Sequence, residues 1–469
     1  MRILVWWLMS LGLGLTMGAQ AAPPSGATLA RFRAALVDHA KFQACFSSKV
    51  TSGYCTIGSS AGAAARQRSP SELVQRIQRR LTHLSASGTE TGALVYHQGE
   101  DGALHVFLLD PQGLQIHERV AQPDLSDLRD GLTRRLHVQT RALSRAPVHA
   151  KRGLERLSRR QAPVRSLEDV ARVVLPGQIA SRVTQGSVRR WLVLPWGPIG
   201  VMPLSALPRL DGEPLATHAS IVVLPDLEAL TLPLGRLPNG PSHPEELLQQ
   251  VFTFDPEPVR RGPRLIVGDP AFPEGGPWTL PPLPGARKEA LAVAEVLGEM
   301  SVDGPLVGAD ATHARVIAKL DRMRNRSGVI YLATHGVADP VNPMHGSFLA
   351  LADQPLMADE IRRRKNSFRQ PLVVLSACQS GLGKAFGAGQ FGVSRVFYAA
   401  GAGQVVGSLW NVDDAATQTL MTRFMAQLMA GRVATEEALR RAMLETRSQF
   451  ADPSSWASFV VFGNPSGPA

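Results

Sequence analysis

The chain has 469 residues, of which 44% are hydrophobic and 19% are charged, and its formal net charge is +11 at pH 7. This length predicts roughly two or three domains, or one large domain with an extension, and the hydrophobic content excludes a wholly disordered chain. The positive charge comes from arginines scattered along the chain. Their densest cluster, within residues 151–165, has no interleaved aromatic residue and no zinc-finger spacing, so we expect a solvated helix face or linker and no nucleic-acid partner.

The first residues have the features of a secretory signal. Arg2 gives a short positive start, residues 3–17 are mainly apolar, and residues 19–21 fit an A-x-A cleavage site. The apolar run is short for a membrane span, and no basic stop-transfer flank comes after it. We expect residues 1–21 to be removed, the folded chain to be periplasmic or secreted, and no membrane span to remain. An uncleaved N-terminal anchor is the alternative.

The chain has three cysteines. Cys45 and Cys55 flank a Ser- and Gly-rich stretch, and in an exported chain this arrangement predicts a disulfide. Closing such a loop stabilises the fold by roughly 2.5–3 kcal/mol in the chain-entropy model. Two reduced thiols are the alternative. Cys378 is then the odd cysteine, which is either reactive or buried and inert.

The N-terminal part of the chain differs from the rest. Residues 22–88 have apolar positions at helical spacing over 27–46 and an amphipathic helix over 71–81, with Ser69 or Ser71 as its N-cap. No fixed-period repeat is present in this region. We therefore expect a small helical region ahead of the main fold.

From Gly92 onward the pattern changes to strands that alternate with helices. A hairpin is expected from strands 93–97 and 104–109, followed by a third strand over 113–120. The further expected helices are 125–145, 150–160, 166–184, 285–300, 358–364, 391–400, 415–430 and 435–449, and the further expected strands are 191–195, 219–225, 264–268, 305–308, 327–333, 347–351, 372–376, 404–409 and 459–462. Residues 233–262 are rich in Pro and Gly, and within them residues 241–262 are expected to be a linker. This alternation predicts an α/β sandwich with a mostly parallel sheet covered on both faces. On helix 285–300 we expect Leu291, Ala294 and Leu297 to face the core.

Two of the expected strands end in residues that can do chemistry. Strand 372–376 is followed by small residues and by Cys378, and strand 327–333 is followed by His335. The carboxyl ends of neighbouring parallel strands meet at one edge of a sheet, where α/β folds bind ligands. A nearby imidazole increases the thiolate fraction of a cysteine and can protonate a leaving amine. The sequence therefore predicts a Cys378–His335 catalytic dyad.

The backbone beside this dyad suits an acyl-transfer site. Gly336 leaves its N–H unobstructed, and with the N–H of Cys378 it could form an oxyanion hole. The alternative is that Cys378 is a small buried apolar residue and that His335 is a loop residue satisfied by hydrogen bonds.

Other chemistries fit the sequence poorly. Ser380, as an alternative nucleophile, does not lie in a G-x-S-x-G motif, and the phosphate-loop pattern fails near residues 381–385 because Ala385 stands where Ser or Thr is needed. The absence of a C-x-x-C motif disfavours thiol redox chemistry. Histidines 97, 105, 117 and 149 have no metal-ligand spacing and are expected to be surface or strand residues. We expect no metal and no cofactor.

Three segments together resemble the CHAT domain, a caspase-like family related to separases and metacaspases. They are residues 332–336 (LATHG), 374–383 (VLSACQSGLG) and 407–417 (GSLWNVDDAAT), with lesser matches at 283–289 (LPGARKE) and 456–461 (WASFVV). The resemblance is strongest over 262–465. It implies that residues 263–469 form a caspase-like catalytic domain and that residues 89–240 form the degenerate first half of the CHAT-like region.

The resemblance also implies roles for individual residues. Cys378 would be the nucleophile of a cysteine peptidase and His335 its acid/base. Asp413 and Asp414 lie where relatives form the pocket for the residue before the scissile bond, and acidic side chains there would favour Arg or Lys by charge pairing. The alternative for either aspartate is a helix cap. Gln379 stands where the family usually has Glu, which leaves substrate preference open.

The sequence as a whole predicts an exported caspase-like cysteine endopeptidase that acts on a protein or peptide substrate, with a preference for basic residues. Activation by a protein partner or by cleavage is compatible with this interpretation. The alternative is a non-enzymatic CHAT-like scaffold that binds a peptide or protein and does not cleave it.

Overall fold

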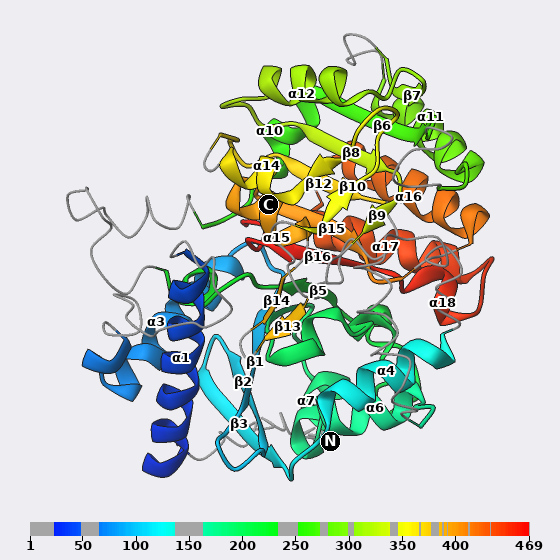
Figure 1. Cartoon of the computed structure of the whole chain (residues 1–469). Coiled ribbons are helices and arrows are strands. Elements are labelled where there is room, and N and C mark those ends of the chain that lie inside the picture. The colour runs from blue at the N-terminus through cyan, green and yellow to red at the C-terminus, as the bar shows by residue number, and fades with distance from the viewer. Residues whose placement is uncertain are drawn as a thin grey trace, which may run out of the picture.

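The computed structural model describes residues 23–47, 65–136, 163–232, 252–272, 280–298, 304–337, 346–364, 367–376, 384–386, 389–391, 393–410, 413–431 and 433–468. The expected helical region comes first and is confirmed by α1 (Gly26–Ser47) and α3 (Pro70–Leu84). Ser69 is the N-cap of α3, because its hydroxyl accepts the N–H of Glu72. Both helices lie beside the first strands of the sheet (Figure 1).

The described residues form one eleven-stranded sheet, in the order β3-β2-β1-β4-β5-β16-β15-β12-β8-β6-β7. In that order the strands are Gly113–Val120, Leu104–Asp110, Thr91–Gln98, Arg190–Leu194, Ser220–Val223, Phe459–Gly463, Gln404–Ser408, Leu372–Leu375, Val329–Ala333, Arg264–Pro270 and Leu306–Gly308. Neighbouring strands are parallel except at β3–β2, β2–β1 and β16–β15. The expected α/β class with a mostly parallel sheet is therefore confirmed.

The strand β16 joins the two halves of this sheet. It pairs in parallel with β5 through Val461 and Val222, and antiparallel with β15 through Val461 and Val406. Consequently the parallel strands β1, β4 and β5 run opposite to β15, β12, β8, β6 and β7. The last strand of the chain thus closes a sheet that the first half begins.

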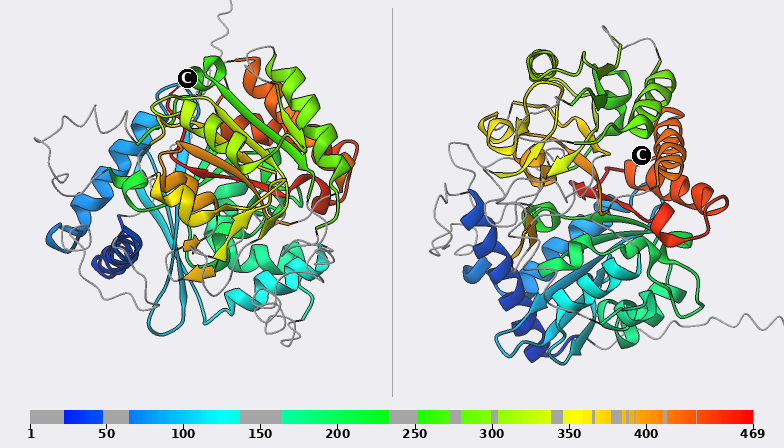
Figure 2. Two further views of the ribbon diagram at one scale, coloured as in Figure 1. Left: turned by 45° about the horizontal axis from the view of Figure 1, so that its top comes forward. Right: turned by 45° about the vertical axis from the view of Figure 1, so that its right-hand side comes forward.

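Helices cover both faces of the sheet (Figure 2). Side chains alternate between the faces, so that Val95 and Ile266 belong to one core while Leu94 and Leu265 belong to the cores on the other side. One face carries α1, α3, α8 (Glu228–Thr231), α10 (Pro256–Arg261), α11 (Pro284–Leu297), α16 (Asp414–Met429), α17 (Thr435–Arg447) and α18 (Pro453–Trp456). The other face carries α4 (Leu125–Arg135), α6 (Leu167–Val174) and α7 (Gly177–Gln185), then α12 (His313–Arg322), α14 (Ala358–Arg363) and α15 (Val393–Ala399).

Shorter elements lie between these. They are the 3₁₀ turns η2 (Gly197–Val201), η3 (Leu204–Ala206) and η4 (Leu215–Thr217), a small sheet of β9 (Gly336–Val337), β10 (Phe348–Leu349) and β11 (Leu356–Met357), and the hairpin of β13 (Lys384–Phe386) and β14 (Gly389–Phe391). The expected strand over 347–351 contains β10, whereas β9, β11, β13 and β14 were not expected, because two or three residues carry no readable alternation.

Several expectations need correction or lie outside the described residues. The helix expected over 125–145 ends at Arg135, and the one expected over 166–184 is two helices, α6 and α7. Leu291 is 46% exposed, so its expected core position is wrong, whereas Leu297 is buried as expected and Ala294 packs partly buried against the core. Ala290 and Val293 are the further core residues of this helix. Most of the basic 151–165 cluster, the Cys45 side chain and Cys55 lie outside the described part of the chain.

A buried arginine also connects the two halves of the sheet through its side chain. Arg190 on β4 donates from Nη1 to Glu436 Oε1 of α17 at 3.1 Å and to the carbonyl of Ser466 at 2.8 Å. Its Nη2 donates to the carbonyl of Leu84 at 2.6 Å, and its Nε to Thr91 Oγ1 at 3.0 Å. Because both charged side chains are almost fully buried, each depends on the other for compensation.

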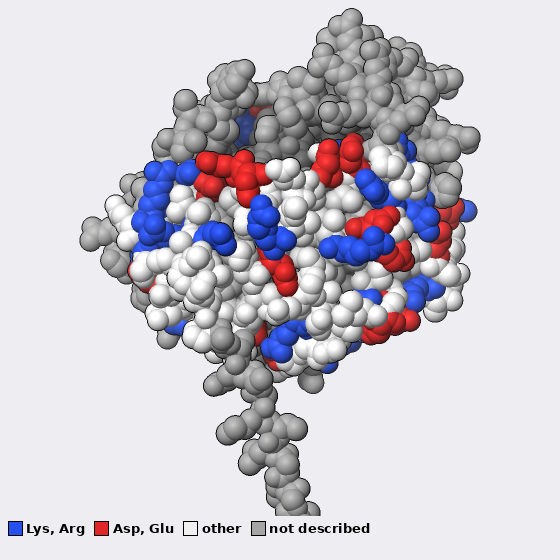
Figure 3. All heavy atoms as spheres, turned by 90° about the horizontal axis from the view of Figure 1, so that it is seen from below, with Lys and Arg blue, Asp and Glu red and all other residues white. Residues whose placement is uncertain are grey.

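The surface in Figure 3 carries basic and acidic side chains interspersed with each other over the described residues on that face. This is the distribution expected from scattered arginines. None of the helices in the described ranges is long and apolar enough to cross a membrane.

Replacing Arg190 tests the buried pair. We expect Arg190→Ala to lower the free energy of unfolding by about 3–5 kcal/mol, because the Glu436 carboxylate stays buried without its counter-charge. Urea unfolding followed by circular dichroism measures the change. Arg447→Ala is the matched control on the same helix as Glu436, since Arg447 pairs with Glu213 at 2.9 Å in a largely exposed position and should cost less than about 1 kcal/mol. Equal losses in the two variants would contradict the role given to Arg190.

Candidate active site

The register of two strands aligns the strand ends that precede the predicted catalytic residues. In the parallel ladder of β8 and β12, Leu332 pairs with Leu375. His335 follows Leu332 by three positions, and Cys378 follows Leu375 by three positions. Residues 377–383, including Cys378, lie outside the described residues. The ladder therefore gives the two residues equal offsets from one paired position at the carboxyl edge of the sheet.

The imidazole of His335 is buried and fixed in orientation. The residue is 4% exposed, and its ring centroid lies 5.0 Å from that of Phe272. Nε2 lies 2.9 Å from the carbonyl oxygen of Pro281, so this nitrogen carries the proton and donates it. In the neutral ring Nδ1 is then unprotonated and can act as an acceptor. Burial lowers the pKa of His335, while the Pro281 carbonyl and the charge of Asp269 act in the opposite direction.

Gly336 begins β9 and leaves its N–H pointing away from the neighbouring strand. Gly336 faces Leu349 of β10, and the N–H of Ala350 donates to the carbonyl of His335 at 2.8 Å. This bond makes Gly336–Leu349 a non-hydrogen-bonded pair of the antiparallel ladder. The β10 ladder therefore does not engage the Gly336 N–H, which is the group expected to contribute to an oxyanion hole.

The two aspartates predicted to line a substrate pocket lie at the start of α16, and both are exposed. Asp413 is its N-cap and accepts the N–H groups of Ala415 and Ala416. Asp414 lies against Gly285 of α11, where an added Cβ would stand 2.1 Å from the Asp414 carboxyl carbon. The helix-cap alternative therefore accounts for the hydrogen bonds of Asp413. Asp414 instead packs closely against α11 and fixes the approach of α11 to α16.

A buried carboxyl group beneath the sheet edge was not found from the sequence. Glu289 of α11 accepts the hydroxyl of Tyr331 on β8, and it is hydrogen-bonded to Ser376, which directly follows β12. The pKa of Glu289 is raised to about 7, mainly by burial and to a smaller extent by nearby Asp414, against the opposing effect of these hydrogen bonds. The residue lies in the 283–289 segment, but helical spacing alone does not distinguish a buried carboxyl from a surface one.

A second group missed by the sequence analysis surrounds His335. Asp269 lies near the end of β6, and Phe272 and Pro281 come from the connection between β6 and α11. An Asp-Pro pair at the end of a strand is the one signal that could have drawn attention to Asp269.

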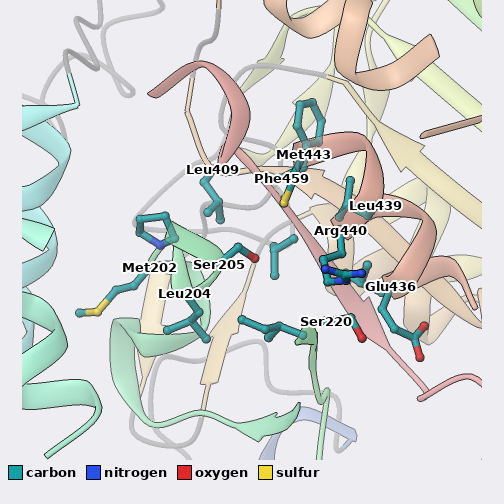
Figure 4. Close-up of a pocket in the computed structure, with 14 residues that line it drawn as sticks. Met202, Leu204, Ser205, Ser220, Leu409, Glu436, Leu439, Arg440, Met443 and Phe459 are labelled. Carbon is teal, nitrogen blue, oxygen red and sulfur yellow. The ribbon is translucent and has the colours of Figure 1, made fainter. Parts of the chain in front are cut away.

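A small pocket lies elsewhere, where η3, β5, β16 and α17 meet (Figure 4). It has room for about one water molecule, at about 10 Å³. Its lining includes Met202, Ser220, Glu436, Arg440 and Phe459, and none of the predicted site residues.

The strand histidines do not form a metal centre. His97 lies 3.0 Å from an Asp38 oxygen, and His105 Nδ1 lies 3.0 Å from His117 Nε2. Within the described ranges, no group of three or more His, Cys, Asp or Glu side chains is arranged to hold a metal ion.

The protonated Glu289 predicts a pH dependence of stability. Its folded pKa of about 7 is above the ordinary value of 4.5, so this carboxyl stabilises the fold fully below pH 4.5 and loses that contribution as the pH rises to 7. We expect wild type to lose about 3 kcal/mol relative to Glu289→Gln between pH 4 and 8, measured by urea unfolding at a series of pH values. Glu295→Gln changes an exposed carboxyl on the same helix and should follow the wild-type profile. A Glu289→Gln profile parallel to wild type would contradict the assignment.

Comparison with known proteins gives the family. Residues 164–464 match the model of the CHAT domain, which is more than half of the chain. Tetratricopeptide repeat protein 28 of Homo sapiens is 25% identical over 366 residues, covering 66% of this chain and 14% of that protein, and its Mus musculus counterpart is 25% identical over 319 residues, covering 54% and 12%. The chain therefore spans a small part of the length of these curated relatives.

Solved structures similar to this chain include a separase–securin complex and a cysteine proteinase. The separase–securin complex of Saccharomyces cerevisiae matches with a TM-score of 0.49 and 13% identity, covering 94% of this chain and 34% of that one. The Arg specific cysteine proteinase gingipain R matches with a TM-score of 0.39 and 13% identity, covering 65% and 71%. With its family model matched across most of the sheet and the edge that holds His335, the chain belongs to the CHAT domain family.

Proposed function

We propose that the protein is a cysteine endopeptidase in which Cys378 is the nucleophile and His335 the acid/base. The observation that supports this proposal is the β8–β12 register, because Leu332 pairs with Leu375 and each of the two residues follows its strand's paired leucine by three positions in the sequence. The fixed tautomer of His335 adds to it, because Nδ1 is left unprotonated. A protein or peptide is the substrate class, and activation by a protein partner or by cleavage remains part of the proposal.

The proposed reaction uses these groups in order. His335 Nδ1 takes the proton of the Cys378 thiol, and the thiolate sulfur attacks the carbonyl carbon of the scissile peptide bond. The resulting oxyanion would be held by the N–H groups of Gly336 and Cys378. The imidazolium then gives its proton to the leaving amine as the C–N bond breaks, and water hydrolyses the thioester and restores the thiol. Burial supports the first step, since it keeps His335 neutral at neutral pH.

We also propose that cleavage occurs after a basic residue. Asp413 and Asp414 are exposed at the start of α16, after the strand β15 that neighbours β12. A carboxylate in that place would pair with a substrate Arg or Lys. Asp413 can serve as an N-cap and still present its second oxygen, because Oδ1 accepts both capping bonds.

A non-enzymatic scaffold is the second candidate. It is supported by the curated relatives, which are described as repeat proteins, and the chain matches only a small part of each. In this case the same sheet edge would bind a peptide or protein partner without cleaving it.

Thiol reactivity distinguishes the two candidates. We expect an electrophilic peptide probe with Arg before its reactive group to label wild type, to label His335→Ala much more slowly, and not to label Cys378→Ala. Hydrolysis of a peptide library should fall by about 10³-fold or more in Cys378→Ala. His313→Ala is the matched control, because this histidine pairs with Glu360 on the α12–α14 side. Labelling that ignores His335, with partner binding kept in Cys378→Ala, would favour the scaffold.

Export and the disulfide are proposed together. Fractionation of the native cell, with mass measurement of the mature chain, should find the protein outside the cytoplasm with residues 1–21 removed. Peptide mapping without reductant should recover Cys45 and Cys55 in one linked fragment, and a free thiol at Cys378. Recovery of three free thiols in the exported protein would rule out the disulfide.

A further inference from the structure

Asp269 has an unusual backbone at the end of β6, the strand next to β8. Its φ is 44°, and the register between β6 and β7 shifts at this residue, which marks a bulge. Pro270 is the next residue, and a proline ordinarily restricts the preceding residue to extended backbone. Left-handed backbone is unfavourable for residues other than glycine, although aspartate tolerates it better than most. Bulges of this kind re-aim a side chain at a strand end.

The Asp269 carboxylate is hydrogen-bonded to the backbone segment that also accepts a hydrogen bond from His335. Asp269 is 9% exposed, and its Oδ1 accepts the N–H of Leu283 at 2.7 Å. Two residues before Leu283, Pro281 offers the carbonyl oxygen that accepts His335 Nε2–H at 2.9 Å. Asp269 therefore fixes the stretch of backbone from which His335 is oriented.

The charge of Asp269 also reaches the imidazole. Among the charged groups of the described residues, Asp269 is the one that raises the pKa of His335 against burial. Two other charged groups come from α11, which packs against this edge. Glu289 is bonded to Tyr331, and the Arg287 guanidinium lies 3.6 Å from where a Cβ would stand on Gly308.

We propose that Asp269 is a positioning residue for His335, fixing the Pro281 carbonyl through Leu283 and stabilising the imidazolium with its carboxylate. The imidazolium is the form that His335 takes after it accepts the thiol proton and before it gives that proton to the leaving amine. This role rests on the peptidase function proposed for His335. It extends the site to a third side chain, on a third strand of the sheet.

Two substitutions separate the charge from the hydrogen bond. Asp269→Asn keeps an oxygen acceptor for Leu283 and removes the charge, and asparagine tolerates the left-handed backbone. Asp269→Gly removes both without backbone strain. Asp255→Asn is the matched control at the N-cap of α10, the helix before β6, because Asp255 Oδ1 likewise accepts a backbone N–H, from Glu257 at 2.9 Å.

The first measurement does not depend on peptidase activity. In the full chain carrying Cys378→Ala and ¹³C-labelled histidine, NMR titration tracks His335, identified by the signal lost in His335→Gln. We expect Asp269→Asn to lower the titration midpoint of His335 and Asp255→Asn to leave it unchanged. An unchanged midpoint in Asp269→Asn would overturn the inference.

The second measurement uses peptide hydrolysis by the chain with Cys378 intact. Asp269→Asn should lower kcat with KM nearly constant, and Asp269→Gly should lower kcat by about 10²-fold, since it also releases the Pro281 carbonyl. A wild-type kcat in Asp269→Gly would overturn the inference. If wild type cleaves no peptide, the peptidase proposal fails, and the His335 titration still decides whether Asp269 acts on this imidazole.

Discussion

Parallel pairing of β8 with β12 is the constraint on which the candidate site depends. The pairing of Leu332 with Leu375 sets where each strand ends relative to the other, and the residues after each strand inherit that alignment. A slip of one residue would turn the side chains of β8 toward the opposite face of the sheet. Such a slip is resisted by cores on both faces, because Tyr331 belongs to one core and Leu332 to the other.

Polar groups buried near this edge are each supplied with a partner. His335 donates to Pro281, Thr334 donates to the carbonyl of Ala350 at 2.6 Å, and Glu289 meets Tyr331 and Ser376. Burying such groups without partners would cost about 1–3 kcal/mol each. Their hydrogen bonds also select a single arrangement of the strand ends, which a catalytic or a binding site needs equally. The buried Glu289 adds sensitivity to pH, because its carboxyl is neutral in the fold at a pH where an exposed one is charged.

The sheet unites two halves whose parallel strands run in opposite directions. The strand direction reverses at β16, which is antiparallel to β15 and parallel to β5. The backbone ladder between β5 and β16 is short. The buried Arg190–Glu436 ion pair is a second connection between the two halves. One hydrophobic core runs beneath both halves, so the first half supports the edge that carries His335 even though that edge belongs to the second.

The sequence by itself determined the α/β class, the helical start and the family resemblance, because long alternating segments and the 332–336, 374–383 and 407–417 motifs are local signals. Periodicity also placed His335 directly after a buried strand. Only the tertiary structure decided that Leu291 is exposed, that β16 joins the halves, and that Glu289, Asp269 and Pro281 surround the strand ends. These features depend on contacts between residues far apart in the chain, and on backbone conformations such as the bulge at Asp269. No local pattern encodes them, since burial of a carboxyl or an imidazole is set by what packs over it.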